Sequence, residues 1–211
     1  MALALPLVYP ITDTRISALS HLEQVKELIA GGATLIQVRE KIAGADEFYR
    51  QAKAAIEYAH DHDVRIVIND RVDIAIAAEA DGVHLGQDDL PVETARELMG
   101  VDRIIGFSTH DLDQISGAVT LPIDYVAFGP IFSTKSKTDT EPVVGLEGLR
   151  HARAASGGVP LVAIGGINAA NIRDILKAGA ASVALISAVL DPRDNISENY
   201  RNLASLADRS D

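Results

Sequence analysis

The chain contains no cysteine, no long hydrophobic run and fewer basic than acidic residues. The absence of cysteine excludes disulfides, thiolate metal ligands and cysteine nucleophiles. No stretch of about 18 consecutive apolar residues occurs, so we expect no segment that spans a membrane. The N-terminal stretch MALALPLVYPITD lacks the basic region of a secretory signal and leads directly into a strand-like segment. We therefore expect a cytoplasmic protein.

The charge balance limits the kinds of partner. The 211 residues carry a formal net charge of −11, which disfavours nucleic acid or an anionic membrane as a partner. Any local cluster of lysine and arginine is therefore informative. The length suits one sizeable domain, and no linker or low-complexity segment divides it, so we expect a single catalytic domain over residues 1–211.

Strand-like and helix-like patterns alternate along the whole chain. The strand-like runs occupy residues 5–11, 34–38, 64–68, 82–85, 103–107, 125–128, 160–164 and 182–186. The helix-like segments occupy residues 17–30, 46–60, 72–80, 92–99, 112–119, 146–155, 169–178 and 196–207. The strands are nearly continuous apolar runs, as expected of parallel strands buried on both faces.

Eight such β-α units predict a single (β/α)8 TIM barrel of the α/β class. A doubly wound open sheet is the alternative fold. It would usually carry a glycine-rich turn after its first strand, whereas residues 10–13 read Pro-Ile-Thr-Asp. The barrel is therefore the expected fold, and its active site should lie where the strands end.

The stretch 124–140 combines a buried strand with a polar loop. After Gly129-Pro130 the chain reads IFSTKSKTDT, which offers several hydroxyls and the cations Lys135 and Lys137. Hydroxyl donors and cations at a strand end suit phosphate oxygens. The alternative interpretation is an ordinary solvated surface loop.

A phosphate site is expected after the seventh and eighth strands. Barrels often hold phosphate between these loops, against a helix N-terminus. Gly165-Gly166 would expose backbone N–H groups there, and Ser187 would add a hydroxyl. A plain glycine turn is the alternative.

Opposite charges are expected to meet on the other side of the mouth. Asp70 and Asp89 follow neighbouring strands, while Arg39, Lys41 and Lys137 follow strands on either side. Carboxylates among cations suit a Mg²⁺ ion between the carboxylates and a diphosphate.

The alternative is that these acidic residues cap helices. Asn69 or Asp70 could cap the helix that follows the third strand, and Asp88 or Asp89 the helix opened by Pro91. Capping alone leaves the nearby cations unexplained. A phosphate site and a Mg-diphosphate site in one mouth imply transfer of an alkyl group from diphosphate to a phosphate-bearing acceptor.

Seven motifs occur in one order along the chain. They are IQVREK (36–41), VIND (67–70), GVHLGQDDLP (82–91), GFSTH (106–110), FGPIFSTKSKT (128–138), IGGI (164–167) and ALISAV (184–189). Together they resemble the thiamine-phosphate synthase family over nearly the whole chain. The resemblance implies a (β/α)8 barrel that joins the small molecules hydroxymethylpyrimidine diphosphate and hydroxyethylthiazole phosphate, with Mg²⁺, to give thiamine phosphate and diphosphate.

The resemblance also implies a role for individual residues. For the pyrimidine diphosphate and its leaving group these are Gln37, Arg39, Lys41, Asn69, Ser108 and Lys137, of which Arg39, Lys41, Ser108 and Lys137 would be catalytic. For Mg²⁺ they are Asp70 and Asp89. For the thiazole phosphate they are Thr134, Ser136, Gly166, Ile186 and Ser187. Two departures are small: Ser136 stands where the family often has Thr, and Asp88 where Glu is usual.

The histidines are not expected to build the site. We expect those in helix patterns to be solvated, namely His21, His60, His62 and His151. His84 should be a hydrogen-bonded barrel residue, whereas His110 lies nearer the mouth and is a candidate for a substrate contact.

Two other functions compete with the synthase. One is a thiazole tautomerase, which would not need Arg39, Lys41, Asn69, Asp70 and Asp89 together. The other is a non-catalytic barrel that binds thiazole phosphate or thiamine phosphate, for which an intact metal and leaving-group set would be unnecessary.

Overall fold

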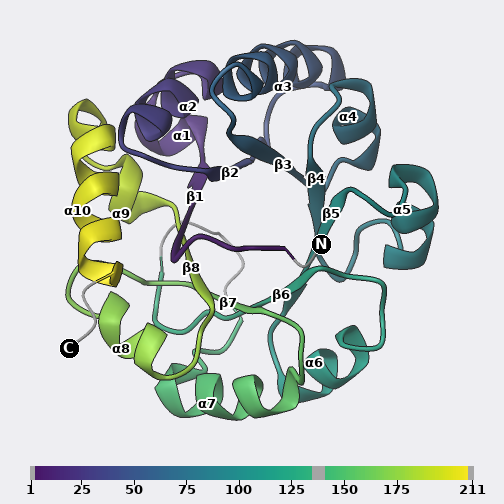
Figure 1. Cartoon of the computed structure of the whole chain (residues 1–211), viewed down its shortest axis with the longest axis vertical. Coiled ribbons are helices and arrows are strands. Elements are labelled where there is room, and N and C mark those ends of the chain that lie inside the picture. The colour runs from purple at the N-terminus through teal and green to yellow at the C-terminus, as the bar shows by residue number, and fades with distance from the viewer. Residues whose placement is uncertain (1–2, 135–140, 209–211) are drawn as a thin grey trace.

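The strands form one closed parallel barrel in the order β1 to β8 (Figure 1). The computed structural model describes residues 3–134 and 141–208. The strands are β1 Val8–Thr12, β2 Leu35–Val38, β3 Arg65–Asn69, β4 Gly82–Leu85, β5 Ile104–Thr109, β6 Tyr125–Phe128, β7 Leu161–Ile164 and β8 Ser182–Leu185. The ring closes where β1 pairs with β8, with Val8 beside Val183. The predicted (β/α)8 barrel is confirmed.

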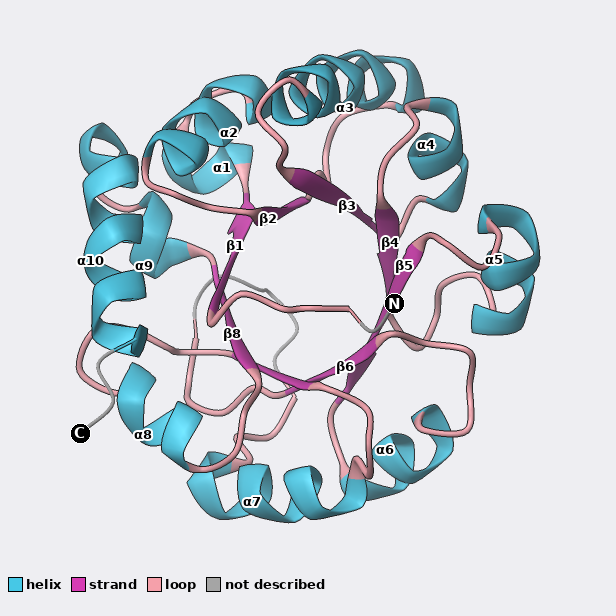
Figure 2. Ribbon diagram, in the orientation of Figure 1, coloured by secondary structure: helices cyan, strands magenta, loops and turns pink. Residues whose placement is uncertain are grey.

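Helices surround the barrel on its outside (Figure 2). They are α1 Thr14–Ser17, α2 His21–Ala30, α3 Ala45–His60, α4 Val72–Ala77, α5 Val92–Met99, α6 Leu112–Ala118, α7 Gly145–Ala155, α8 Ile172–Lys177, α9 Ser187–Leu190, the 3-10 helix η1 Arg193–Asn195 and α10 Ile196–Asp208. Every residue of β2, β4, β6 and β8 is buried, because helices cover the outer face and side chains fill the interior. Among the helices described, none is long and apolar enough to cross a membrane.

The first predicted helix is two helices. α1 ends at Ala18, whose φ of 57° is left-handed, and α2 begins after Ser20. Ser20 and Glu23 form a capping box, in which each side chain bonds the other residue's backbone N–H. A single helix over residues 17–30 was therefore wrong at its start, although the local signal S-x-x-E was present in the sequence.

The end of the barrel where the strands begin is held by two aspartates. Asp81 Oδ2 accepts a hydrogen bond of 2.7 Å from Ile66 N, at the start of β3. Asp124 Oδ2 accepts one of 2.8 Å from Ile105 N, at the start of β5, and also lies 2.7 Å from Arg96 Nη2. These contacts, which we call the lower clips, tie loops to strands at the end opposite the βα loops.

Candidate active site

A cavity of about 740 Å³ opens where the strands end. Its walls include every predicted site residue that lies in the described part of the chain. These are Gln37, Arg39, Lys41, Asn69, Asp70, Asp89, Ser108, Thr134, Gly166, Ile186 and Ser187. Ser136 and Lys137 lie outside the described residues. The structure thus brings together side chains separated by up to about three quarters of the sequence, as the strand-end argument expects.

Lys41, Asp70 and Asp89 form a charged cluster on one wall. Lys41 Nζ lies 2.5 Å from Asp70 Oδ2, and Asp89 Oδ2 accepts a 2.7 Å hydrogen bond from Gly86 N. Burial raises the pKa of Asp89 above its usual value. The adjacent Asp70 carboxylate also raises this pKa, whereas the hydrogen bond from Gly86 N lowers it. A cation between two carboxylates this close would reduce the repulsion between their negative charges.

The backbone at Asp70 is left-handed. Its φ is 63°, a conformation that costs most L residues about 1–2 kcal/mol but that Asp tolerates better. The Asp70 N–H donates 2.8 Å to the His84 carbonyl of the neighbouring strand, which fixes this turn. The strained residue therefore lies in the wall of the cavity, where such conformations often serve function.

The helix-capping alternative for these carboxylates is wrong. α4 is capped at Arg71 and α5 at Pro91, and neither cap makes a side-chain hydrogen bond to the helix. Asp88 is exposed, whereas Asp89 is partly buried and contacts Asp70. The structure thus separates the two adjacent aspartates by environment.

The donor set suits Mg²⁺ better than a metal held entirely by protein. Within the described ranges, no group of three or more His, Asp or Glu could hold an ion. Asp70 and Asp89 line the cavity beside Lys41 and could offer two hard oxygen ligands. Mg²⁺ commonly takes one or two carboxylates and fills its remaining positions with phosphate oxygens and water. The residues therefore fit the ion that the sequence implied.

Arg39 enters the cavity with a counter-ion that sequence reasoning missed. Its Nη1 lies 2.5 Å from Asp13 Oδ2, and both side chains are almost completely buried. Arg15 Nη2 also contacts this carboxylate, at 3.0 Å. Asp13 directly follows β1, so the rule that selected residues after the other strands could have found it.

A hydrogen-bonded chain of side chains forms the cavity floor. His84 Nε2 lies 2.8 Å from Ser108 Oγ, and its Nδ1 lies 2.9 Å from the Tyr125 hydroxyl. Tyr125 is 3.2 Å from the Tyr9 hydroxyl, which accepts a bond from Gln37 Nε2 at 3.3 Å. Burial raises the pKa of Tyr9 to about 12, so this phenol is neutral near pH 7. The two tyrosines and Gln37 therefore present hydrogen-bonding groups without formal charge.

Gly106 makes room for this floor. It lies on β5 between His84 and Tyr125, whose rings stack with centroids 5.5 Å apart. A Cβ at this position would overlap the Tyr125 ring and the His84 imidazole. Only glycine permits the stacked pair, and His84 is the hydrogen-bonded barrel residue that we expected.

The opposite wall contains the residues predicted to bind phosphate. Gly166 has a φ of 64°, and a Cβ there would lie 2.6 Å from Ser133 O. Packing alone therefore requires glycine at this position, whether or not an anion binds to its N–H. Ser187 begins the short helix α9 directly after β8, and Thr134 lines the cavity from the β6 loop. A hydroxyl at a helix start beside a glycine turn suits a phosphate group.

One histidine prediction was wrong. His21 is fully buried, with Nδ1 2.8 Å from Thr12 Oγ1 and Nε2 3.3 Å from Glu40 Oε2. Its place at the start of α2 turns it toward the barrel rather than toward solvent. His60, His62 and His151 are exposed as predicted, although His62 lies in the turn after α3 and not in a helix. His110 lines the cavity, and its Nδ1 lies 2.7 Å from Gly129 O.

Comparison with known proteins gives a consistent result. A family model described as thiamine monophosphate synthase matches residues 8–189. A thiamine-phosphate synthase of Persephonella marina is 42% identical over 200 residues, which cover 94% of each chain. One of Koribacter versatilis is 45% identical over 211 aligned residues, covering 96% of this chain and 98% of its own. The solved thiamine phosphate pyrophosphorylase of Pyrococcus furiosus superposes with a TM-score of 0.84 at 38% identity, over 95% of this chain and 94% of its own.

Proposed function

This chain belongs to the thiamine monophosphate synthase family, and from that premise we propose that it joins hydroxymethylpyrimidine diphosphate to hydroxyethylthiazole phosphate. The products are thiamine phosphate and diphosphate. The chain is an enzyme of the transferase class, as its relatives indicate. The observation that best supports the reaction is one cavity with cations and paired carboxylates on one wall and a glycine turn with hydroxyls on the other. Such a cavity can hold two anionic substrates with their reactive ends together.

The bond changes balance without an added acid or base. The C–O bond between the pyrimidine methylene and the diphosphate breaks, and its electron pair leaves with the oxygen. The lone pair of the thiazole nitrogen forms the new C–N bond. This neutral nitrogen has no proton to lose, so the reaction needs no general base.

Stabilising the leaving diphosphate is the main task of the protein. Arg39 and Lys41 bring positive charge to the cavity wall, and Lys137 would add a third cation from the β6 loop. Asp70 and Asp89 would hold a Mg²⁺ that neutralises diphosphate oxygens when it is bound. Fixed cations in a site shielded from water act strongly on charge that develops during bond breaking.

The remaining residues would bind and orient the two substrates. Asn69 and Ser108 lie on the cation side, so we assign them to the diphosphate, and Gln37 to the pyrimidine. The thiazole phosphate group would lie at Gly166 and Ser187, on the opposite wall. The remaining residues that we assign to this phosphate are Thr134, Ser136 and Ile186. We further propose that the reaction takes place in the cytoplasm and that the partners are these small molecules rather than nucleic acid.

A product assay tests the proposal. Purified protein, both substrates and Mg²⁺ should yield thiamine phosphate and diphosphate in equal amounts. A tautomerase would isomerise a thiazole phosphate without releasing diphosphate. A binding protein would bind either ligand without turnover. Either result would replace the proposed reaction.

A further inference from the structure

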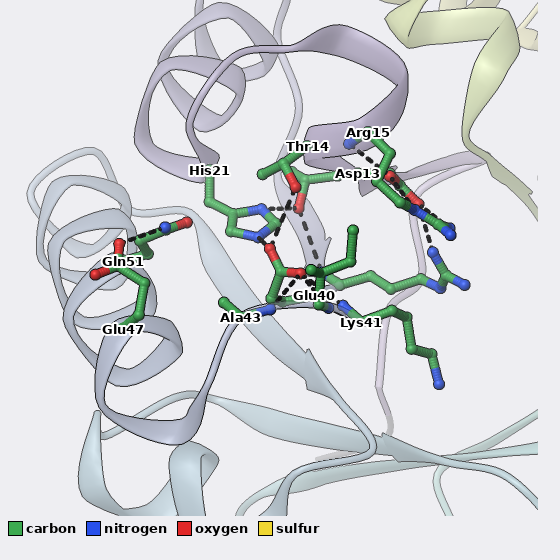
Figure 3. Close-up of polar contacts among 12 residues, drawn as sticks. Asp13, Thr14, Arg15, His21, Glu40, Lys41, Ala43, Glu47 and Gln51 are labelled. Carbon is green, nitrogen blue, oxygen red and sulfur yellow. Dashed lines mark hydrogen bonds and ion pairs between the residues drawn. The ribbon is translucent and has the colours of Figure 1, made fainter.

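Glu40 lies between two residues of the cavity wall but does not line the cavity. Arg39 and Lys41 on either side of it both do. The Glu40 side chain is turned back under the segment that follows β2, as Figure 3 shows. Its Oε1 accepts hydrogen bonds from three successive backbone N–H groups, those of Lys41 at 2.8 Å, Ile42 at 2.7 Å and Ala43 at 3.2 Å. One carboxylate oxygen thus sets the course of the backbone that carries Lys41.

The second oxygen of Glu40 joins this segment to α1 and α2. Oε2 lies 3.2 Å from Thr14 Oγ1 and 3.3 Å from His21 Nε2. The Glu40 side chain is only 5% exposed, and that of His21 is not exposed at all. A carboxylate held by four N–H or O–H donors and in contact with His21 Nε2 in a nearly dry setting is a rigid anchor. Charge-assisted hydrogen bonds are about twice as strong as neutral ones.

The chain of hydrogen bonds continues from His21 to β1 and returns to Arg39. Thr12 Oγ1 accepts from Arg39 N at 3.3 Å and lies 2.8 Å from His21 Nδ1. If the Thr12 hydroxyl donates to Nδ1, then His21 carries its proton on Nε2 and donates it to Glu40. Burial lowers the pKa of His21, which agrees with this neutral form. Both backbone neighbours of Glu40 are therefore fixed by one network.

We propose that Glu40 is a positioning residue, which holds the 39–43 segment so that Arg39 and Lys41 meet the leaving diphosphate. This inference rests on the proposed synthase function. Glu40 itself would touch neither substrate, and its effect would pass through the backbone amides that it binds.

A through-space effect of the Glu40 charge predicts the opposite sign. Glu40 adds a negative charge next to two cations that face an anion. If charge alone mattered, its removal would strengthen diphosphate binding, because like charges repel. If positioning matters, its removal weakens binding. The direction of the change therefore separates the two explanations.

The experiment measures binding of inorganic diphosphate with Mg²⁺ to the wild type and to Glu40→Gln by calorimetric titration. The amide retains the size of the side chain, but its NH₂ group faces the His21 Nε2–H. We expect the diphosphate Kd to rise about tenfold. This is the lower end of the loss that is typical when a residue that hydrogen-bonds and orients a metal ligand is removed, and we apply it here by analogy. Binding of hydroxyethylthiazole phosphate, measured separately, should be unchanged.

Glu47→Gln is the matched control. Glu47 lies in the first turn of α3, its side chain is 44% exposed, and it pairs with Arg50. This variant removes the same charge without touching the backbone amides, so its diphosphate Kd should equal that of the wild type. Thr14→Val is a milder variant, which removes one donor to Glu40 and keeps the carboxylate. It should weaken diphosphate binding less than Glu40→Gln does. If Glu40→Gln does not fold, the diphosphate Kd of Thr14→Val still tests the inference.

The outcomes are distinct. Suppose first that the wild type makes thiamine phosphate. A diphosphate Kd of Glu40→Gln equal to or below that of the wild type would then overturn the inference, even if the melting temperature of the variant falls. A wild type that binds diphosphate but makes no thiamine phosphate would reject the proposed function, and this inference with it. A raised Kd in Glu40→Gln and an unchanged one in Glu47→Gln would support it.

Discussion

Asp13 and Arg39 form an ion pair that is almost completely removed from solvent, with side chains only 2% and 8% exposed. Asp13 comes from the end of β1 and Arg39 from the end of β2, which pair side by side in the barrel. The guanidinium is thus held in place before any substrate binds. A fixed cation needs little reorganisation when charge develops on a leaving group, which is the condition for strong electrostatic stabilisation.

Asp13→Asn should destabilise the fold strongly. The amide can still cap α1, but Arg39 is left buried without its counter-charge. Removing one partner of a buried pair typically costs about 3–5 kcal/mol. Denaturant unfolding measures the change. Asp73→Asn is the control, because its pair with Arg71 is exposed and should contribute about 0–1 kcal/mol. Equal losses in the two variants would contradict the burial argument.

Lys137→Ala should reduce kcat far more than it raises KM. Lys137 belongs to the hydroxyl-rich loop after β6, and its proposed contact is with the departing diphosphate. By analogy with one oxyanion donor, the barrier should rise by about 3–4 kcal/mol. Steady-state kinetics decide the point, with Lys135→Ala as the neighbouring control. An unchanged kcat in Lys137→Ala would remove this residue from the mechanism.

Ser187→Ala should weaken the thiazole phosphate and leave the pyrimidine diphosphate unaffected. The variant removes one hydroxyl donor from a charged acceptor, a loss of about 1–3 kcal/mol. Calorimetric titration of each substrate separates the effects. If both substrates bind less tightly by the same factor, the cavity does not contain two distinct anion sites.

Asp89→Asn should raise the Mg²⁺ concentration needed for activity by a large factor. Asp89 contacts Asp70 and would be one of about two carboxylates on the ion. Asp88→Asn is the adjacent control, because Asp88 is exposed and a charge near a helix start contributes only about 0.3–1 kcal/mol. Activity at saturating substrates is titrated with Mg²⁺. A larger shift in Asp88→Asn would exchange the two assignments, and no shift in either would argue against this metal site.

Glu40 should contribute stability that is lost in acid. Burial opposes its ionisation, but the amides of Ile42, Ala43 and Lys41 outweigh burial and lower the pKa of Glu40 to about 2. A lowered folded pKa adds stability above the unfolded value of about 4.3, and this stability disappears as the pH falls toward the folded value. The melting temperature of wild type should exceed that of Glu40→Gln most at neutral pH. The difference should narrow between about pH 4 and 2, and a constant difference would contradict the shift.

Much of this architecture follows from local sequence. The strands are apolar runs, and the barrel places whatever follows each run in one mouth, so Lys41, Asp70 and Ser187 could be selected without coordinates. The contact between His21 and Glu40 could not be found in this way. It joins α2 to the segment after β2, and the two residues are 19 positions apart in the sequence. The helical period does place His21 on the face of Val25 and Leu28, which are buried in α2. It does not reveal that a carboxylate from the segment after β2 lies against that face.

The lower clips at Asp81 and Asp124 have a consequence for protein engineering. They join loops to β3 and β5 at the rim farthest from the cavity, through Ile66 N and Ile105 N. Tolerance to heat and choice of substrate can therefore be selected on separate rims of the same barrel. A library of variants at residues around the clips leaves the residues of the cavity unchanged. A library of variants in the cavity keeps the hydrogen bonds of the clips at the opposite end of the barrel.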